Sequence, residues 1–364
     1  MALIPHTSVG APPWSYRRKP AKTVAHLGYN WAMPAPVPPS IPSSFAQMAA
    51  RVSNWGRWGA EDQLGTLNLI DRAARMRGLA SVRDGDAFAL ALPLSAEEGI
   101  QMGFIPGRVN PTRTMISVNE SMGPGPGWIA FSEDVVTMAM QCATHWDGLA
   151  HASYGDGPDG GRIYNGFPAS STTEAGAGRL GIHLVGSLVS RGVLLDVARA
   201  KGVEILEAGY PITAADLDAA CALGSVGLEP GDVVLVRTGQ MAHLALAGRP
   251  GLAGAEPVRD LLAYTWPTPG LTVATAEWFH ARDVAAVAID TLVLEVYPSE
   301  DPDLPLPVHA LHLVEMGMTQ GQNWFLDELA EACAADGRYQ FLLDATPLPF
   351  TNALGSPVAP VAIR

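Results

Sequence analysis

The chain has 364 residues, of which 48% are hydrophobic and 16% are charged, and its formal net charge is −13. This balance is typical of a well-buried globular protein and excludes an intrinsically disordered one. An acidic surface repels phosphate backbones and anionic lipids, so we expect neither nucleic acid nor a membrane as a partner.

The N-terminal region has Pro, Ser and Arg where a secretory signal would have an apolar stretch. No apolar run approaches the ~20 residues that are needed to span a bilayer. The three cysteines, Cys142, Cys221 and Cys333, form no CxxC pair and no zinc-finger spacing. Together these features predict a cytoplasmic protein with reduced thiols.

Residues 1–52 are rich in proline and predict an N-terminal arm with polyproline character, followed by a folded domain over residues 53–364. The arm is compatible with two interpretations. It could be a disordered tail, or it could lie across a neighbouring subunit and bury its aromatic side chains there.

Along the folded domain, strands are predicted to alternate with helices. The predicted strands are residues 86–92, 135–140, 192–197, 233–237 and 284–290; the predicted helices are residues 71–81, 274–282, 323–335 with a stop at Gly337, and a helix from the N-cap Thr213 towards Gly224. Because several strands are separated only by loops, this order predicts an α/β fold with a mixed sheet rather than a strict βαβ series.

One glycine-rich segment, residues 176–181, fits the dinucleotide pattern GxGxxG. A polar stretch precedes it where a Rossmann fold would have a strand, so the pattern is a weak indication of a redox enzyme. The chain also lacks the G-x-S-x-G elbow, the HExxH motif and the Walker loop, and serine-hydrolase and zincin functions therefore have no support from motifs.

The segment from Gln141 to His151 reads QCATHWDGLAH. If the chain is extended here, His145 and Asp147 point to the same side, where an imidazole nitrogen and a carboxylate oxygen can bind one cation. Three protein ligands plus water is the usual arrangement at a catalytic metal. His151 lies beyond the turn at Gly148, close to such a site. The spacing alone is also compatible with a buried, hydrogen-bonded His–Asp pair.

This segment resembles the signature of the cyclase family, His-x-Gly-Thr-His-x-Asp-x-x-x-His, which occurs in bacterial kynurenine formamidase and isatin hydrolase. Further stretches match longer members of the family: residues 58–68 (WGAEDQLGTLN), 192–197, 230–239 (PGDVVLVRTG) and 355–360 (GSPVAP). The resemblance covers most of the chain from residue 53 to residue 363. It implies a swivelling β/β/α domain, with a mixed sheet and flanking helices, over residues 53–364.

The resemblance also implies a divalent metal, Mn²⁺ or Zn²⁺. In this family His145 and Asp147 match metal ligands, and His151 matches the histidine proposed as general acid/base. Gln322 stands where formamidases have a glutamate ligand, and isatin hydrolase similarly uses a glutamine.

Two further positions belong to the possible site. Gln141 stands where formamidases have the first histidine of the signature. His309 matches a histidine near the C-terminus of the family, although His312, three residues on, is an alternative. With glutamines at positions 141 and 322, we expect one catalytic metal per chain rather than two, because an amide brings no negative charge.

These observations predict a hydrolase that cleaves an amide C–N bond, in a cyclic amide, by a metal-activated water. A lactone is the close alternative as substrate. A second class of function, a non-catalytic protein that binds a small molecule through a metal, is favoured by the two glutamines. The expected partners are a small-molecule substrate and further copies of the chain in a dimer or tetramer.

Overall fold

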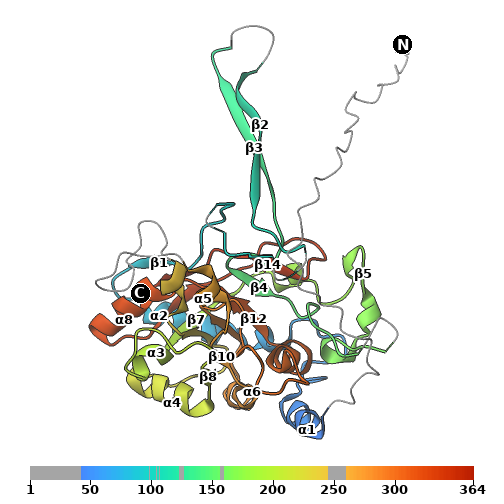
Figure 1. Ribbon diagram of the computed structural model, residues 1–364, viewed down its shortest axis with the longest axis vertical. Coiled ribbons are helices and arrows are strands. Elements are labelled where there is room, and N and C mark those ends of the chain that lie inside the picture. The colour runs from blue at the N-terminus through green and yellow to red at the C-terminus, as the bar shows by residue number, and fades with distance from the viewer. Residues whose placement is uncertain are drawn as a thin grey trace. The chain divides into compact units, whose positions relative to one another are not determined.

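The computed structural model describes residues 42–97, 99–103, 105, 107–122, 127–155, 160–244 and 260–364. Within them, a nine-stranded mixed sheet runs through the fold (Figure 1). In spatial order its strands are β1 (Ala87–Ala89), β15 (Val361–Ile363), β13 (Gln340–Asp344), β7 (Val189–Asp196), β9 (Val233–Arg237), β11 (Ala286–Ile289), β12 (Thr319–Gln322), β4 (His145–Asp147) and β14 (Gly355–Pro357). The neighbours from β7 to β12 are parallel, and all other neighbouring pairs are antiparallel.

Helices cover both faces of this sheet. They are α1 (Ser43–Val52), α2 (Arg72–Ser81), α3 (Val197–Ala200), α4 (Ala214–Leu223), α5 (Leu261–Thr265), α6 (Val273–His280), α7 (Pro307–His309), α8 (Asp327–Asp336) and the π-helix η6 (Ala310–Met316). Short 3₁₀ helices connect them: η1 (Gly65–Leu69), η2 (Tyr164–Gly166), η3 (Ala169–Ser171), η4 (Ile182–Val185) and η5 (Gln240–Leu244). The mixed sheet with flanking helices confirms the predicted fold class.

The central parallel strands are buried on both faces, and their side chains alternate between two cores. In β9, Val234 and Val236 pack in a core that contains side chains of α1, α4 and α6. Val233 and Leu235 of the same strand pack on the opposite side, in the core that contains side chains of α8. This period of two is the reason why β9 reads as an uninterrupted apolar run in the sequence.

Local sequence signals correctly predicted where α4 begins and where α8 ends. Thr213 is the N-cap of α4, as predicted, and it forms a capping box with Asp216; Gly337, with φ +74°, ends α8 in the left-handed conformation. The predicted start of α8 at Asn323 is wrong. The backbone N–H groups of Asn323 and Trp324 donate to the carbonyls of Thr291 and Ile289, so this segment bonds to the end of β11 instead of forming a helical turn.

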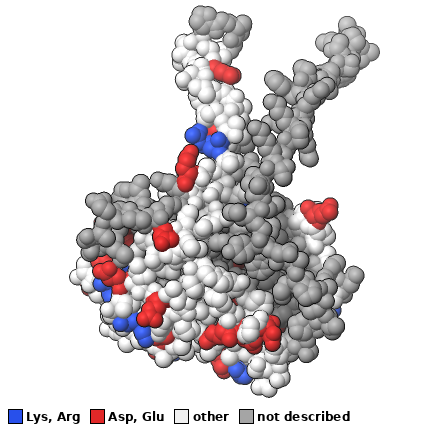
Figure 2. All heavy atoms as spheres, in the orientation of Figure 1, with Lys and Arg blue, Asp and Glu red and all other residues white. Residues whose placement is uncertain are grey.

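The strand predicted at residues 135–140 is only partly confirmed. β3 (Ala130–Thr137) pairs with β2 (Thr112–Ser121) in an exposed hairpin, and the chain turns between that hairpin and β4. Figure 1 shows the hairpin extending away from the sheet, and in Figure 2 most of its surface is neither acidic nor basic. Two smaller pairs are β8 (Pro211–Ile212) with β10 (Gly270–Leu271) and β5 (Thr172–Thr173) with β6 (Gly176–Ala177). Because β6 opens the GxGxxG segment as part of a short hairpin, that segment lacks the strand–helix context of a dinucleotide site.

The structure describes only the last residues of the expected N-terminal arm. Residues 43–52 form α1, whose Phe45, Ala49 and Val52 are buried in the core that also contains α4 and α6. These ten residues thus pack with the domain, while the rest of the arm lies outside the described residues. Among the described residues, no helix is long and apolar enough to cross a membrane.

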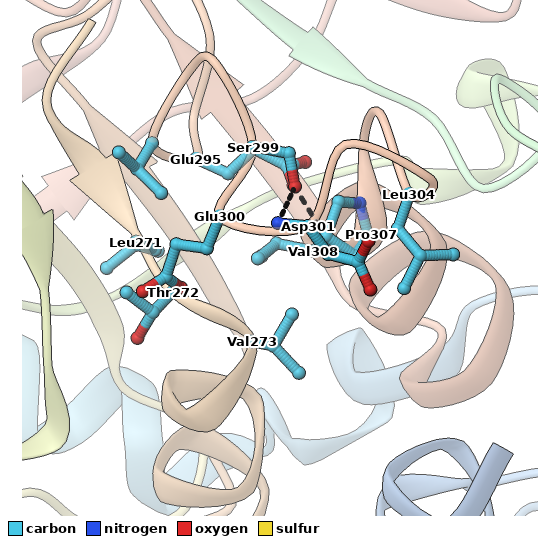
Figure 3. A pocket seen from close by; sticks show the side chains of 11 residues that line it. Leu271, Thr272, Val273, Glu295, Ser299, Glu300, Asp301, Leu304, Pro307 and Val308 are labelled. Atoms are coloured by element: carbon cyan, nitrogen blue, oxygen red, sulfur yellow. Dashed lines mark hydrogen bonds between the residues drawn. The ribbon is translucent and has the colours of Figure 1, made fainter. Parts of the chain in front are cut away.

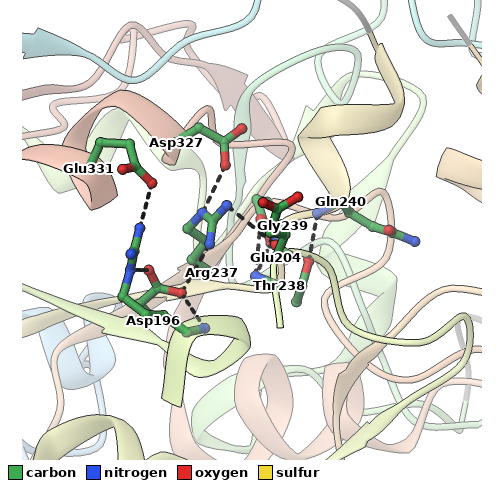
Figure 4. Close-up of polar contacts among 10 residues, drawn as sticks. Asp196, Glu204, Arg237, Thr238, Gly239, Gln240, Asp327 and Glu331 are labelled. Carbon is green, nitrogen blue, oxygen red and sulfur yellow. Dashed lines mark hydrogen bonds and ion pairs between the residues drawn. The ribbon is translucent and has the colours of Figure 1, made fainter. Parts of the chain in front are cut away.

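A buried ion-pair network joins the carboxyl ends of two central strands to α8 (Figure 4). Arg237, at the end of β9, donates to Asp196 at the end of β7 (3.1 Å) and to Asp327 in the first turn of α8 (2.8 Å). Arg199 adds a second contact to Asp196 at 3.1 Å. Since the Asp196 carboxylate is fully buried, removal of Arg237 would leave it with the single ion pair to Arg199 among the described residues, and would break the link to Asp327.

Candidate active site

The candidate site is built on β4, which lies between β12 and β14. The register places Asp147 opposite Gln320 and His145 opposite Gln322 across the β4–β12 pair. Because side chains alternate along a strand, these four lie on one face of the sheet. His145 and Asp147 are almost fully buried, and the predicted orientation of the two towards the same side is confirmed.

Tryptophans pack behind this strand pair. Trp146 and Trp324 are fully buried and meet edge to face, with ring centroids 4.9 Å apart. Gly321, between the two glutamines of β12, leaves room for them, because a Cβ at this position would lie 2.6 Å from Trp324 Nε1 and 3.0 Å from Trp146 Cε3. Trp146 therefore has a packing role and holds β4 in position behind the site.

The imidazole of His145 is oriented by its own loop. Its Nδ1 lies 2.9 Å from the carbonyl oxygen of Ala143, which leaves Nε2 without a proton in the neutral ring. Asn323 donates to the same carbonyl at 2.9 Å and accepts from the hydroxyl of Tyr264 at 2.7 Å. Ala143 and Asn323 both have left-handed backbones, with φ of +51° and +60°. Backbone strain of this kind persists where the surrounding contacts over-determine it, often at functional sites.

Two ligand-type atoms face each other in this buried region. His145 Nε2 and Asp147 Oδ1 lie 3.6 Å apart, and neither has a hydrogen-bond partner among the described residues. Burial lowers the pKa of His145, so its ring is neutral and Nε2 is available as a ligand. Burial raises the pKa of Asp147, but the nearby His151, His145 and His309 outweigh this effect and the net pKa lies below the ordinary value.

His151 approaches the same carboxylate from the loop after β4. Its Nε2 lies 3.6 Å from Asp147 Oδ1, and 25% of its side chain is exposed. Its Nδ1 is 3.4 Å from Gln141 Nε2. The structure thus places His151 between the buried carboxylate and solvent, with Gln141 in contact with its other nitrogen.

His309 and Gln322 enter the site from the other side. His309 Nε2 is 4.0 Å from Asp147 Oδ2, while Gln322 Nε2 donates to Asp147 Oδ2 at 2.7 Å and lies 3.3 Å from His309 Nε2. Of the two alternative histidines, His309 faces the carboxylate. Glu295 holds it in place, because its carboxylate contacts His309 Nδ1 and accepts the backbone N–H groups of Val308 and His309. Burial lowers the pKa of His309, but Glu295 and Asp147 outweigh it and the net shift is upward.

The unpartnered atoms fit a divalent cation. A neutral imidazole nitrogen and a carboxylate oxygen are ordinary ligands of Zn²⁺ and Mn²⁺, and two of them buried together without partners would be costly unless an ion or water satisfied both. Among the described residues, no three His, Cys, Asp or Glu side chains are arranged to hold a metal ion by themselves. A complete protein shell would therefore need the side-chain oxygen of Gln322 beside His145 and Asp147.

Three residues near the site were missed by the sequence reasoning. Gln320 donates to Asp147 Oδ2 at 3.4 Å, and its place two residues before Gln322 on a strand was a usable signal. Glu295 precedes His309 by 14 residues on an irregular segment and offered none. Arg108 lies within electrostatic range of Asp147, and its guanidinium has neither a hydrogen bond nor an ion pair with the described residues; burial lowers its pKa.

A small cavity of about 50 Å³ lies behind Glu295 and is distinct from this site (Figure 3). Its lining includes Leu271, Val273, Leu304 and Val308 and is mostly apolar. Its lining includes Glu295, which contacts His309, and Val308, which precedes His309 on α7, but it contains none of the ligand-type atoms described above.

Comparisons with known proteins show the family and the fold of the chain. The Cyclase family model matches residues 73–296. A crystal structure described as a novel cyclase is 35% identical and covers 87% of this chain and 99% of its own, with a TM-score of 0.74. Isatin hydrolase A from Labrenzia aggregata is 19% identical, with 79% of this chain and 96% of that chain covered and a TM-score of 0.51.

Isatin hydrolase A from Ralstonia solanacearum is 20% identical, covers 80% of this chain and 96% of its own, and has a TM-score of 0.51. No curated protein matches the chain. The isatin hydrolases show that the fold is shared, and the family model and the novel cyclase extend the likeness to the sequence. The chain belongs to the cyclase family.

Proposed function

We propose that this chain is a metal-dependent hydrolase that cleaves the amide C–N bond of a cyclic amide. The observation that carries the proposal is the pair of buried, unpartnered atoms His145 Nε2 and Asp147 Oδ1, with the part-exposed His151 beside them. His145, Asp147 and the side-chain oxygen of Gln322 would hold the ion, Mn²⁺ or Zn²⁺. When bound, such an ion lowers the pKa of water and polarises a carbonyl group.

His151 is the group that we assign to proton transfer. Its Nε2 faces the site, so it can take a proton from the attacking water and return it to the nitrogen that leaves. Gln141 supports both states of the ring, because a carboxamide carries a donor and an acceptor and can turn either one towards Nδ1. His309, oriented by Glu295, lies on the opposite side of Asp147, where it can contact the substrate.

A cyclic amide is supported by the nature of the similar structures. One isatin hydrolase holds the product analogue thioisatinate, and it covers 81% of this chain at 17% identity with a TM-score of 0.53. A lactone hydrolase remains the close alternative, because the same residues would open a cyclic ester. The non-catalytic alternative is favoured by Gln141 and Gln322, which leave Asp147 as the single anionic ligand.

A substrate panel tests the proposal. The purified chain, depleted of metal and then reloaded with Mn²⁺ or Zn²⁺, is assayed against cyclic amides, lactones of the same ring size and N-formyl anilines. We expect turnover of a cyclic amide that stops on chelation and returns with metal. Stoichiometric binding without turnover would favour the non-catalytic function, and turnover that ignores chelation would contradict the metal site.

We also propose that the chain forms a homo-oligomer, a dimer or tetramer, through the β2–β3 hairpin. Apolar side chains of the hairpin and its tip are exposed: Met115, Ile116, Val118, Met122, Trp128, Ile129, Phe131, Val135 and Val136. Exposed apolar patches mark interaction surfaces, and an isolated two-stranded hairpin is marginally stable by itself. Light scattering should show a smaller particle for Trp128→Ser with Phe131→Ser than for the control Met76→Ser on α2, and a monomeric wild type would refute the idea.

A further inference from the structure

His312 is a buried histidine that the proposed reaction does not use. It lies in the π-helix η6, three residues after His309, and it is fully buried with its ring edge to face against Phe279, centroids 5.8 Å apart. Its carbonyl oxygen accepts the backbone N–H of Met318 at 2.7 Å, directly before β12. Neither ring nitrogen has a hydrogen-bond partner within the described residues.

Gln320 carries the complementary unpaired atom. It lies on β12 opposite Asp147, and its side-chain nitrogen donates to Asp147 Oδ2 at 3.4 Å. Its side-chain oxygen is buried and has no hydrogen-bond partner in the part of the chain that the structure describes. A carboxamide can rotate by half a turn, and in the wrong orientation its oxygen would face the carboxylate and repel it.

Burial, together with the nearby His309, holds the pKa of His312 at about 3, so its ring is neutral and carries one N–H donor. Gln320 acts in the opposite direction and raises this pKa, so its side chain lies near the ring, although in this structure neither ring nitrogen makes a hydrogen bond to it. A buried donor and a buried acceptor that both lack partners are costly, and a hydrogen bond between them removes both costs.

We propose that His312 is a positioning residue for the cation site, which acts through Gln320. One ring N–H of His312 donates to the side-chain oxygen of Gln320, and this contact keeps the carboxamide nitrogen of Gln320 directed at Asp147 Oδ2. Gln322 donates to the same oxygen at 2.7 Å. Oδ2 of Asp147 then accepts hydrogen bonds from two carboxamides, and Oδ1 is the oxygen that remains directed at the cation. This role rests on the proposed function, in which Asp147 holds a metal.

Cation affinity measured by calorimetry, with Mn²⁺ and the full-length chain, tests this role. Partners outside the ligand shell typically change metal affinity about 10–100-fold, and we expect a loss of about 10-fold for His312→Leu and for Gln320→Leu. The double variant should bind no more weakly than the weaker single variant, because both changes remove one pathway. His312→Asn or His312→Gln, which restore an N–H donor, should recover most of the affinity.

Phe279→Leu is the matched control, because it removes the aromatic ring that packs against His312 and changes no polar group. We expect it to lower the melting temperature of the metal-free protein and to leave the Mn²⁺ affinity unchanged. Additive losses in the double variant, no recovery with either amide, or tighter binding by Gln320→Leu would overturn the positioning role.

A crystal structure of the wild type separates this inference from the proposed function. It should place one His312 ring nitrogen about 3 Å from the side-chain oxygen of Gln320. A clear separation of the two side chains would overturn the inference even if the protein binds Mn²⁺. A wild type that binds no divalent ion, but shows the contact, would instead refute the proposed function.

Discussion

Replacing His151 with alanine should remove most amide turnover and leave cation binding intact. His151 Nε2 is 3.6 Å from Asp147 Oδ1, and 25% of its side chain is exposed, so it can exchange protons with solvent while it faces the site. A general acid–base group typically contributes about 10²–10⁴-fold in rate. At about 1.36 kcal/mol for each factor of ten, this loss corresponds to roughly 2.7–5.4 kcal/mol of transition-state stabilisation.

Cation affinity in this variant should depend on pH in a defined way. After burial, which raises the pKa of Asp147, the nearby His151 is the largest influence and lowers it. The pKa of Asp147 is therefore higher in the variant, and protons compete with the cation up to a higher pH. Metal content should be near normal at neutral pH and should fall earlier than in the wild type on acidification.

The assay compares kcat for a cyclic amide and for the lactone of the same ring. A nitrogen leaving group needs a proton more than an ester oxygen does, so the amide should lose more than the lactone. Added imidazole should restore part of the rate, because the vacated position is open to solvent. Gln141→Ala, which removes only the contact to Nδ1, should lose less than His151→Ala. Near-normal kcat with metal bound would refute the assignment.

Three more outcomes are expected. Asp147→Asn should weaken cation binding more than Gln322→Ala does, because Asp147 is the only anionic ligand we assign; calorimetry that ranks them the other way would contradict the proposed shell. Mass spectrometry should find one catalytic metal per chain, because a second dication would have no assigned carboxylate to offset its charge. Two ions per chain that are both needed for activity would contradict this. The Asp336 pKa is raised by burial but lowered more strongly, to about 2, by hydrogen bonds from Arg338 and Arg364. This carboxylate therefore stabilises the fold above its unfolded pKa near 4, and the contribution is lost as pH falls towards 2. In thermal unfolding from pH 5 to pH 2, Asp336→Asn should reduce this acid dependence, and an unchanged profile would contradict the linkage.

Much of the fold could be predicted from the sequence where the determinants are local. The side chains of β9 alternate between two apolar cores, so an unbroken apolar run predicted its bounds. The capping box of Thr213 and Asp216, and the left-handed Gly337 at the end of α8, depend on hydrogen bonds between residues a few positions apart. The start of α8 was wrongly predicted at Asn323, because the backbone N–H groups of Asn323 and Trp324 bond to Thr291 and Ile289, just after β11 and at its end, which are distant in sequence.

In the candidate site, too, local features could be predicted from the sequence and long-range ones could not. That His145 and Asp147 share a side of the chain follows from the alternation of a strand and was evident from their spacing. That Gln322 lies opposite His145, and Gln320 opposite Asp147, depends on the pairing of β4 with β12. The partners in that pairing are more than 170 residues apart, and hydrophobic periodicity in either strand cannot set it.

Only the tertiary structure selected between the two histidines of the C-terminal region. His309 and His312 are three residues apart in one helical segment, and both are almost fully buried. Their separation is the result of long-range contacts: Glu295 orients His309 towards Asp147, whereas His312 lies against Phe279 and beside Gln320. Spacing along the chain determines which residues can share a strand or a helical turn, but the packing of distant elements determines which side chain meets the buried carboxylate.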